Sequence, residues 1–312
     1  MIDGGQLITV NSANKVGAVV YSETQVINTQ NAAACTATAV STSTVITAAH
    51  CLHRPNDSNT ASGRVYGKQY CVSDFARKRI CSDQIFVDPD YIAKSPNTTA
   101  EELGQRGLDF GFIVFPDGTF SEYSMVSNDQ IKPADNVVMA GFSPSNLSDS
   151  SSGSKRFGWN VVNSLRSWPP APTSSEAEDV LVKTNYGNGF SQAAVNHGDS
   201  GGPLFTTACE IAGVASMRAS SSGSTDSSFH TNLTANYVYN KLFNLWINNG
   251  RSGYLCGLTG TDTEFCPDTG RYRPVTVRVK LGEAEFPCSG FNLSAQPQTT
   301  ETNSFGPSCP AQ

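Results

Sequence analysis

The feature that most constrains the fold is a series of short β-prone runs separated by clusters of glycine, proline, asparagine and serine. Short strands with turn residues between them are typical of an antiparallel barrel or sandwich with long loops. The polar stretches 143–158 and 219–228 are predicted to be surface loops. The predicted strands lie in residues 15–21, 45–47, 84–87, 110–115, 136–139, 179–182 and 210–216.

Residues 235–249 depart from this pattern. Tyr239, Leu242, Phe243 and Trp246 recur at helical spacing, so they predict an amphipathic helix that packs on the β-structure. The chain beyond it carries four of the nine cysteines and is too short to build a core unaided. We therefore expect two units, residues 1–250 and a disulfide-stapled extension at residues 251–312.

Composition narrows the class of protein. The net charge is -6 and there is no basic stripe, which argues against a nucleic-acid partner. No apolar run is long enough to span a membrane. Nine cysteines in 312 residues favour an exported, secreted or periplasmic protein, although no signal peptide follows Met1.

Two strings carry residues suited to nucleophilic catalysis. The first is Thr47-Ala48-Ala49-His50-Cys51, and the second runs from Gly198 through Asp199 and Ser200 to Pro203. A serine hydroxyl becomes a good nucleophile when a positioned base takes its proton, and histidine titrates in the useful range. The glycines beside Ser200 allow a sharp turn that aims N–H groups at a developing oxyanion.

These strings resemble the TAAHC and GDSGGP signatures of the chymotrypsin/trypsin family of serine proteases, over about residues 2–249. The resemblance implies an all-β fold of two packed antiparallel six-stranded barrels with a C-terminal helix. It implies a catalytic triad of His50, Asp109 and Ser200, with Asp109 leading into an apolar strand as in the family. It also places the oxyanion hole at the N–H groups of Gly198 and Ser200. The rivals for the acid are Asp88, Asp90 and Asp117, which look like turn residues.

The same resemblance implies an activation pair, in which the amine of Ile2 would be freed by proteolysis and bind Asp199. It assigns the substrate pocket to positions on both sides of the nucleophile. Because the pocket floor lacks a carboxylate, we expect a neutral, apolar preference, with an acidic preference assisted by Arg218 as the alternative. Ser216 fits the position that binds the substrate backbone. The pocket residues are Ala194, Val195, His197, Ser216, Met217 and Arg218.

The other histidines, His53, His197 and His230, have no motif behind them and are expected at the surface or in loops. No His/Cys spacing suits zinc, so neither a metal nor a cofactor is expected. The partners expected are a protein or peptide substrate and protease inhibitors, with a monomer as the default. The alternative function is a catalytically silent homologue that acts as a binding module.

Family resemblance pairs Cys35 with Cys51. Proximity in sequence suggests Cys71–Cys81, Cys256–Cys266 and Cys288–Cys309, and other pairings stay open. This scheme leaves Cys209 as either a free thiol or a link to the extension.

Overall fold

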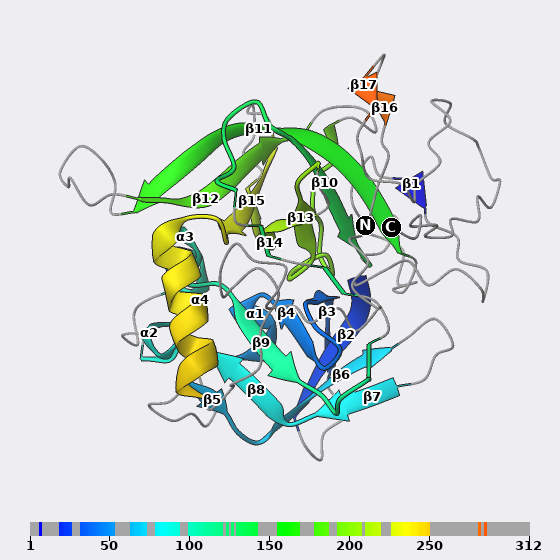
Figure 1. The fold of residues 1–312 in the computed structure, drawn as a ribbon, viewed down its shortest axis with the longest axis vertical. Helices are drawn as coiled ribbons and strands as arrows, with labels where there is room; N and C mark the ends of the chain where they lie inside the picture. Colours follow the sequence, from blue (N-terminus) through cyan, green and yellow to red (C-terminus); the bar gives the residue numbers. More distant parts are fainter. Residues whose placement is uncertain are drawn as a thin grey trace.

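A computed structural model gives the fold of the chain (Figure 1). It describes residues 6–7, 19–26, 32–53, 63–73, 79–93, 99–120, 123–124, 126–127, 129–142, 155–168, 178–186, 192–207, 210–219, 226–249, 280–281 and 284–285.

The first sheet consists of eight antiparallel strands contributed by the first 114 residues. Both described disulfides belong to it: Cys35–Cys51 joins β3 (Ala32–Ala39) to α1 (Ala49–Leu52), and Cys71–Cys81 joins β6 (Lys68–Ser73) to β7 (Arg79–Ser82). Both pairings therefore confirm the sequence prediction. In spatial order the strands are β5 (Arg64–Val65), β8 (Gln84–Val87), β9 (Gly111–Val114), β4 (Thr44–Thr47), β3 (Ala32–Ala39), β2 (Val19–Val26), β6 (Lys68–Ser73) and β7 (Arg79–Ser82).

The second sheet closes on itself. Six of its strands form a closed antiparallel barrel, because β11 (Arg156–Trp168) pairs with both β10 (Asn136–Gly141) and β12 (Glu178–Asn185). The strand β1 (Gln6–Leu7) adds to β11 outside the closure. Two short strands, β16 (Lys280–Leu281) and β17 (Ala284–Glu285), form a separate hairpin. In spatial order the second sheet is β1 (Gln6–Leu7), β11 (Arg156–Trp168), β10 (Asn136–Gly141), β13 (Pro203–Phe205), β14 (Ile211–Ala219), β15 (Ser227–Asn232) and β12 (Glu178–Asn185).

The predicted all-β architecture is confirmed, with differences in detail. Each predicted run contributes to a strand, but the first sheet has eight strands where six were expected. Residues 156–158, predicted as loop, begin the long strand β11. The strands β3, β6, β7 and β15 were not predicted, because they are rich in alanine, serine or charged residues and are paired through tertiary contacts.

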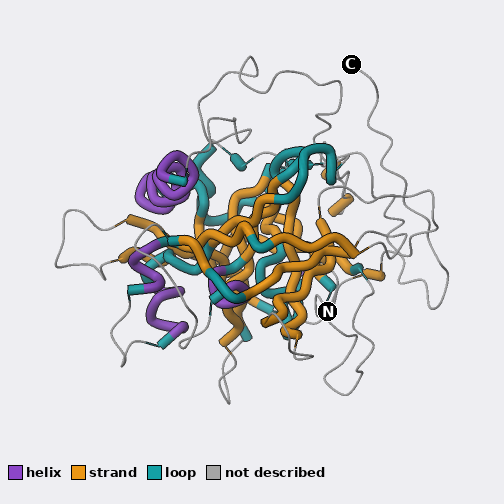
Figure 2. The backbone as a smooth tube through the Cα atoms, turned by 90° about the horizontal axis from the view of Figure 1, so that it is seen from below, coloured by secondary structure: helices purple, strands orange, loops and turns teal. Residues whose placement is uncertain are grey.

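The C-terminal helix α4 (Asn236–Asn248) lies at one side of the strands, as Figures 1 and 2 both show. It buries Val238, Leu242, Leu245 and Trp246, whereas Tyr239 and Phe243 of the predicted stripe are only partly buried. The Trp246 ring meets Phe112 of β9 edge-on, with centroids 5.1 Å apart. A helix that follows the second barrel in sequence therefore packs on the first sheet.

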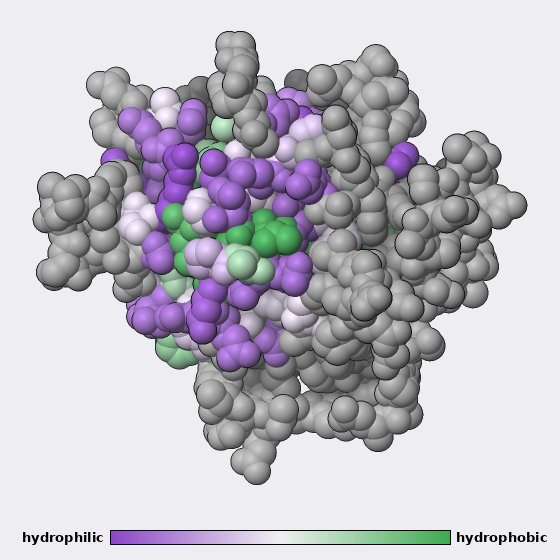
Figure 3. Space-filling view, turned by 90° about the horizontal axis from the view of Figure 1, so that it is seen from above, coloured by the Kyte–Doolittle hydropathy of each residue, from purple (hydrophilic) through white to green (hydrophobic). Residues whose placement is uncertain are grey.

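Seen from above, the described residues present a largely hydrophilic face around one hydrophobic area (Figure 3). No helix in the described part of the chain combines the length and apolar character needed to cross a membrane. Two further short helices are α2 (Pro89–Ile92) and α3 (Ala100–Gln105).

Candidate active site

His50 is held by a short helix at the end of β4. The helix α1 begins two residues after β4 ends, and the disulfide from Cys51 fixes it to β3. The neighbours Ala49 and Leu52 are buried, while the His50 side chain remains 29% exposed. This anchoring leaves the imidazole accessible on a rigid base.

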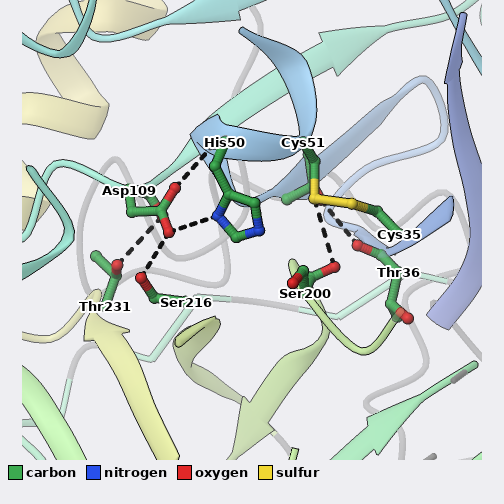
Figure 4. Close-up of polar contacts among 9 residues, drawn as sticks. Cys35, Thr36, His50, Cys51, Asp109, Ser200, Ser216 and Thr231 are labelled. Atoms are coloured by element: carbon green, nitrogen blue, oxygen red, sulfur yellow. Dashed lines mark hydrogen bonds and ion pairs between the residues drawn. A yellow bond between two sulfur atoms is a disulfide. The ribbon is translucent and has the colours of Figure 1, made fainter. Parts of the chain in front are cut away.

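Asp109 lies in the segment before β9 and is buried, with 2% of its surface exposed. Its Oδ1 accepts the backbone N–H of His50 at 2.9 Å. Its Oδ2 lies 2.8 Å from His50 Nδ1 and accepts the Ser216 hydroxyl at 2.5 Å. Figure 4 shows the carboxylate between these partners, with the other nitrogen of His50 on the side where Ser200 lies.

This pairing changes the protonation of both groups. For Asp109, burial alone would raise the pKa, but the charge of His50 and the hydrogen bonds from His50 and Ser216 together lower it. For His50, burial alone would lower the pKa, but the charge and hydrogen bond of Asp109 outweigh it and raise the pKa above 6.5. Asp109 therefore stays ionised and favours a proton on the imidazole.

Ser200 occupies a tight turn before β13. The next residue, Gly201, has a φ of +82°, and a Cβ there would lie 1.9 Å from Thr47 Oγ1 and 2.3 Å from the Thr36 carbonyl oxygen. Only glycine fits such a position. Within the described part of the chain, the N–H groups of Gly198 and Ser200 donate no hydrogen bond. The turn therefore packs closely against the first sheet. The N–H groups of Gly198 and Ser200 remain available to donate hydrogen bonds.

Thr36 of β3, which the sequence did not single out, connects this turn to the first sheet. Its N–H donates to the Ser200 carbonyl at 2.8 Å, and its Oγ1 donates to the Gly198 carbonyl at 2.8 Å. The same Oγ1 accepts the Phe142 N–H at 3.1 Å. No sequence motif marks this threonine, because its contacts join residues more than 100 positions apart.

Comparison with known proteins assigns the family. The family described as trypsin-like peptidase domain matches residues 35–214, which is more than half of the chain. The chain belongs to the trypsin-like peptidase family. A comparison with curated proteins finds no match. Among solved structures, a Glu endopeptidase in complex with MPD is similar at 14% identity and a TM-score of 0.46, over 80% of this chain and 97% of that one.

In this peptidase domain, Asp199 directly precedes Ser200, the predicted nucleophile, and is completely buried. Its Oδ2 accepts the Asn196 N–H at 2.8 Å. The carboxylate lies against Gly141, where a Cβ would come within 2.1 Å of Oδ1. Ile2, its predicted activation partner, lies outside the described residues, as do Cys209 and the four cysteines of residues 251–312.

The predicted pocket residues separate into two groups. Ala194 and Val195 are buried, and the Val195 N–H donates to Ser228 Oγ at 3.0 Å, whereas His197 is exposed. The second group lies on β14, where the Ser216 hydroxyl binds Asp109, a contact that the sequence did not predict.

Arg218 and Met217 complete the β14 group. The Arg218 guanidinium lies 2.6 Å from Asp226 Oδ2 and 5.4 Å from the centre of the Tyr186 ring. Its charge is therefore already balanced. Met217 packs partly buried against the core, with its Cε close to Gly104 of α3.

The rival carboxylates lie elsewhere. Asp88 caps α2 by accepting the Asp90 N–H, and Lys241 is paired with Asp90. Asp117 is exposed in a turn. None of them contacts the imidazole of His50 in the described residues.

The expected surface or loop position is wrong for His230, which is completely buried within β15. His53 lies just after α1, outside any helix or strand as expected, but it is buried, with 4% of its surface exposed. Neither could be placed from sequence, because each is buried by segments distant in the chain.

The described residues bring one group of potential metal ligands within 4.8 Å of one another, namely Cys35, His50 and Cys51. The two sulfurs are bonded to each other, so they are not thiolates that could hold a metal. The two described disulfides are compatible with an extracellular or periplasmic location.

The contact between Asp109 and His50 predicts how the pKa of His50 responds to a substitution at Asp109. Asp109→Asn removes the negative charge, so the pKa of His50 should fall below its wild-type value. NMR titration of the ring protons measures it, with the His50 signal assigned by its loss in His50→Gln. Asp117→Asn, in an exposed turn, is the control. An unchanged His50 pKa in Asp109→Asn would show that the pair does not set it.

Thr36→Val tests the connection between β3 and the turn that carries Ser200. The substitution keeps the shape but leaves the buried Phe142 N–H and Gly198 carbonyl each without one partner. The free energy of unfolding in urea should fall by about 1–3 kcal/mol. Thr38→Val is the matched control, because Thr38 Oγ1 is buried without a partner among the described residues. Its free energy of unfolding should stay the same or rise, because the substitution removes a buried hydroxyl that has no hydrogen bond among these residues. Equal losses in both variants would contradict the role of Thr36.

Proposed function

We propose that this protein is a secreted or periplasmic serine endopeptidase that cleaves peptide bonds through an acyl-enzyme intermediate. The observation that carries the proposal is the buried Asp109 carboxylate bound to both the backbone and Nδ1 of His50. A carboxylate in that place fixes the imidazole tautomer and stabilises the imidazolium that forms when a serine is deprotonated.

In the proposed mechanism, the second ring nitrogen of His50, Nε2, accepts the Ser200 hydroxyl proton as Oγ attacks the peptide carbonyl. The carbonyl oxygen becomes an oxyanion, and the free N–H groups of Gly198 and Ser200 are suited to receive it. His50 then protonates the leaving amine, which leaves an acyl-Ser200 ester. A water molecule, deprotonated by His50, hydrolyses the ester and restores the hydroxyl.

The proposed pocket disfavours basic substrates. Its floor residues Ala194 and Val195 are apolar, so no carboxylate there can pair with a lysine or arginine side chain. The one cation on the pocket wall, Arg218, is engaged with Asp226. We therefore infer a peptidase without Lys/Arg specificity.

The decisive test uses a covalent serine reagent. An organophosphonate should label Ser200 alone, as mapped by mass spectrometry, and Ser200→Ala should lose the label and about a million-fold in kcat. Ser41→Ala, in the turn before β4, is the control and should keep both. Unlabelled wild-type protein that hydrolyses no peptide would instead be a silent homologue acting as a binding module.

We further propose that Asp199 pairs with the amine of Ile2 once that residue becomes the N-terminus. A carboxylate as buried as that of Asp199 strongly favours a cationic partner. Protein that begins at Ile2 should therefore hydrolyse peptides faster than protein that retains Met1. The rate of peptide hydrolysis by both forms, at equal protein concentration, measures the difference. Equal rates would rule out this switch.

A further inference from the structure

The disulfide Cys35–Cys51 lies beside the imidazole of His50. Its two sulfurs and one ring nitrogen of His50 all lie within 4.8 Å of one another. Nδ1 of the ring is engaged with Asp109, whereas Figure 4 shows the other nitrogen, Nε2, on the side of the ring toward Cys51 and Ser200. Two sulfurs and an imidazole nitrogen therefore meet at one edge of the candidate active site.

Reduction of this disulfide would turn the three groups into a ligand set for zinc. Zinc binds cysteine thiolates at about 2.3 Å and histidine nitrogens at about 2.0 Å in a tetrahedral arrangement, so two donors on one ion are about 3.5–3.8 Å apart. Once the S–S bond is broken, small side-chain movements give the three donors this spacing. Two cysteines and a histidine, with the fourth position open, are a set that zinc accepts.

Asp109 already supplies the support that a zinc-bound histidine needs. A histidine ligand donates its second ring N–H to a carboxylate or carbonyl oxygen, which fixes the tautomer and orients the ring. The contact of 2.8 Å between His50 Nδ1 and Asp109 Oδ2 has this form, and Asp109 is buried. The carboxylate therefore keeps the proton on Nδ1 and leaves the lone pair of Nε2 available to a metal.

The net charge of the site favours a dication over bare thiolates. Cys35 and Cys51 are each 4% exposed, and an uncompensated charge is costly at that depth. A disulfide is neutral, and one Zn²⁺ ion with two thiolates is neutral as well. The exchange of one for the other adds no net charge beside Asp109.

The disulfide is not the only link that holds α1 in place. Asp109 Oδ1 accepts the His50 N–H at 2.9 Å, and the buried Lys68 donates through Nζ to the Leu52 carbonyl at 3.2 Å. The strand β3, which carries Cys35, pairs with both β2 and β4. We therefore expect the two cysteines to stay side by side after reduction.

We propose that the reduced protein binds one Zn²⁺ ion through Cys35, Cys51 and Nε2 of His50. A dithiol reductant opens the disulfide: its two hydrogens pass to the cysteine sulfurs, and the dithiol becomes a disulfide. Zn²⁺ then displaces the proton of each thiol and accepts the lone pair of Nε2. Exchange with an oxidised dithiol restores the disulfide and releases the ion.

The bound ion would also inhibit peptide hydrolysis, a consequence that rests on the proposed function. While Nε2 is bound to zinc it cannot accept the proton of Ser200, so the general base is lost. A chain that has not met an oxidising environment carries both thiols. Zinc therefore holds that form inactive, and oxidation activates it.

Metal binding to the full chain tests the site directly. The protein is reduced with a dithiol, freed of the reductant under anaerobic conditions and titrated with Co²⁺, whose thiolate complexes absorb by charge transfer. Wild type should bind one Co²⁺ more than Cys35→Ser/Cys51→Ser. The matched control Cys71→Ser/Cys81→Ser removes the other described disulfide and should keep that ion. Equal binding by wild type and Cys35→Ser/Cys51→Ser would overturn the inference.

The histidine and its carboxylate are tested by zinc affinity, measured in competition with a chelator. Asp109→Asn should weaken binding by about 10- to 100-fold, the usual effect of losing the partner that orients a ligand. His50→Gln, which removes the nitrogen donor, should weaken binding at least as much, and Asp117→Asn is the control. An unchanged affinity in His50→Gln would show that the cysteines bind zinc without the imidazole and would overturn the inference.

Circular dichroism of the same samples reports folding. Reduced wild type should keep its native spectrum or regain it with Zn²⁺, because the free energy of metal binding adds to that of folding. Zinc should also raise the Tm of reduced wild type more than that of Cys35→Ser/Cys51→Ser. Reduced protein that stays unfolded in the presence of zinc would contradict the proposed site.

Rates of peptide hydrolysis separate this inference from the proposed function. Zinc should slow the reduced wild type by at least about a hundredfold, the contribution of a general base, while the oxidised protein keeps its rate. An active oxidised protein whose reduced form binds no zinc at these residues, or is not slowed by it, refutes the inference and leaves the serine endopeptidase intact. Zinc bound at Cys35, Cys51 and His50 of a protein that hydrolyses no peptide when oxidised refutes the proposed function and leaves the metal site.

Discussion

The structure depends above all on one buried negative charge. The Asp109 carboxylate is almost inaccessible to water, so it must be satisfied inside the protein. Its donors come from both sheets: the N–H and imidazole of His50 from α1, and the hydroxyl of Ser216 from β14. The carbonyl of Asp109 also accepts the Thr231 hydroxyl from β15. Any shift of one sheet against the other would leave this charge underpaired.

The turn that carries Ser200 imposes a different constraint, because there is no space for a side chain next to it. Gly201 lies so close to Thr47 and the Thr36 backbone that no side chain fits. Thr36 then binds the carbonyl groups on either side of Asp199. The hydrogen bonds to the Asp109 carboxylate and the close packing at Gly201 thus fix the positions of the three candidate catalytic residues. These are His50, Asp109 and Ser200.

Much of this arrangement could be predicted from sequence, because the motifs are local. The two strings around His50 and Ser200 and the pairing of Cys35 with Cys51 needed only neighbouring residues and a family pattern. Strand β15 and the burial of His230 could not be predicted, since a Ser/Thr-rich run becomes a strand only when β12 and β14 pair with it. Thr36 was missed for the same reason.

The packing of α4 also affects the order in which parts of the chain fold. Phe112 follows Asp109 by three residues, yet its ring is covered by Trp246, more than 130 positions later in the chain. Contacts of such wide sequence separation form late, after the loops between them have closed. During synthesis strand β9, which follows Asp109, therefore stays incompletely covered until α4 has emerged. A chain truncated before α4 lacks this cover on the strand next to Asp109.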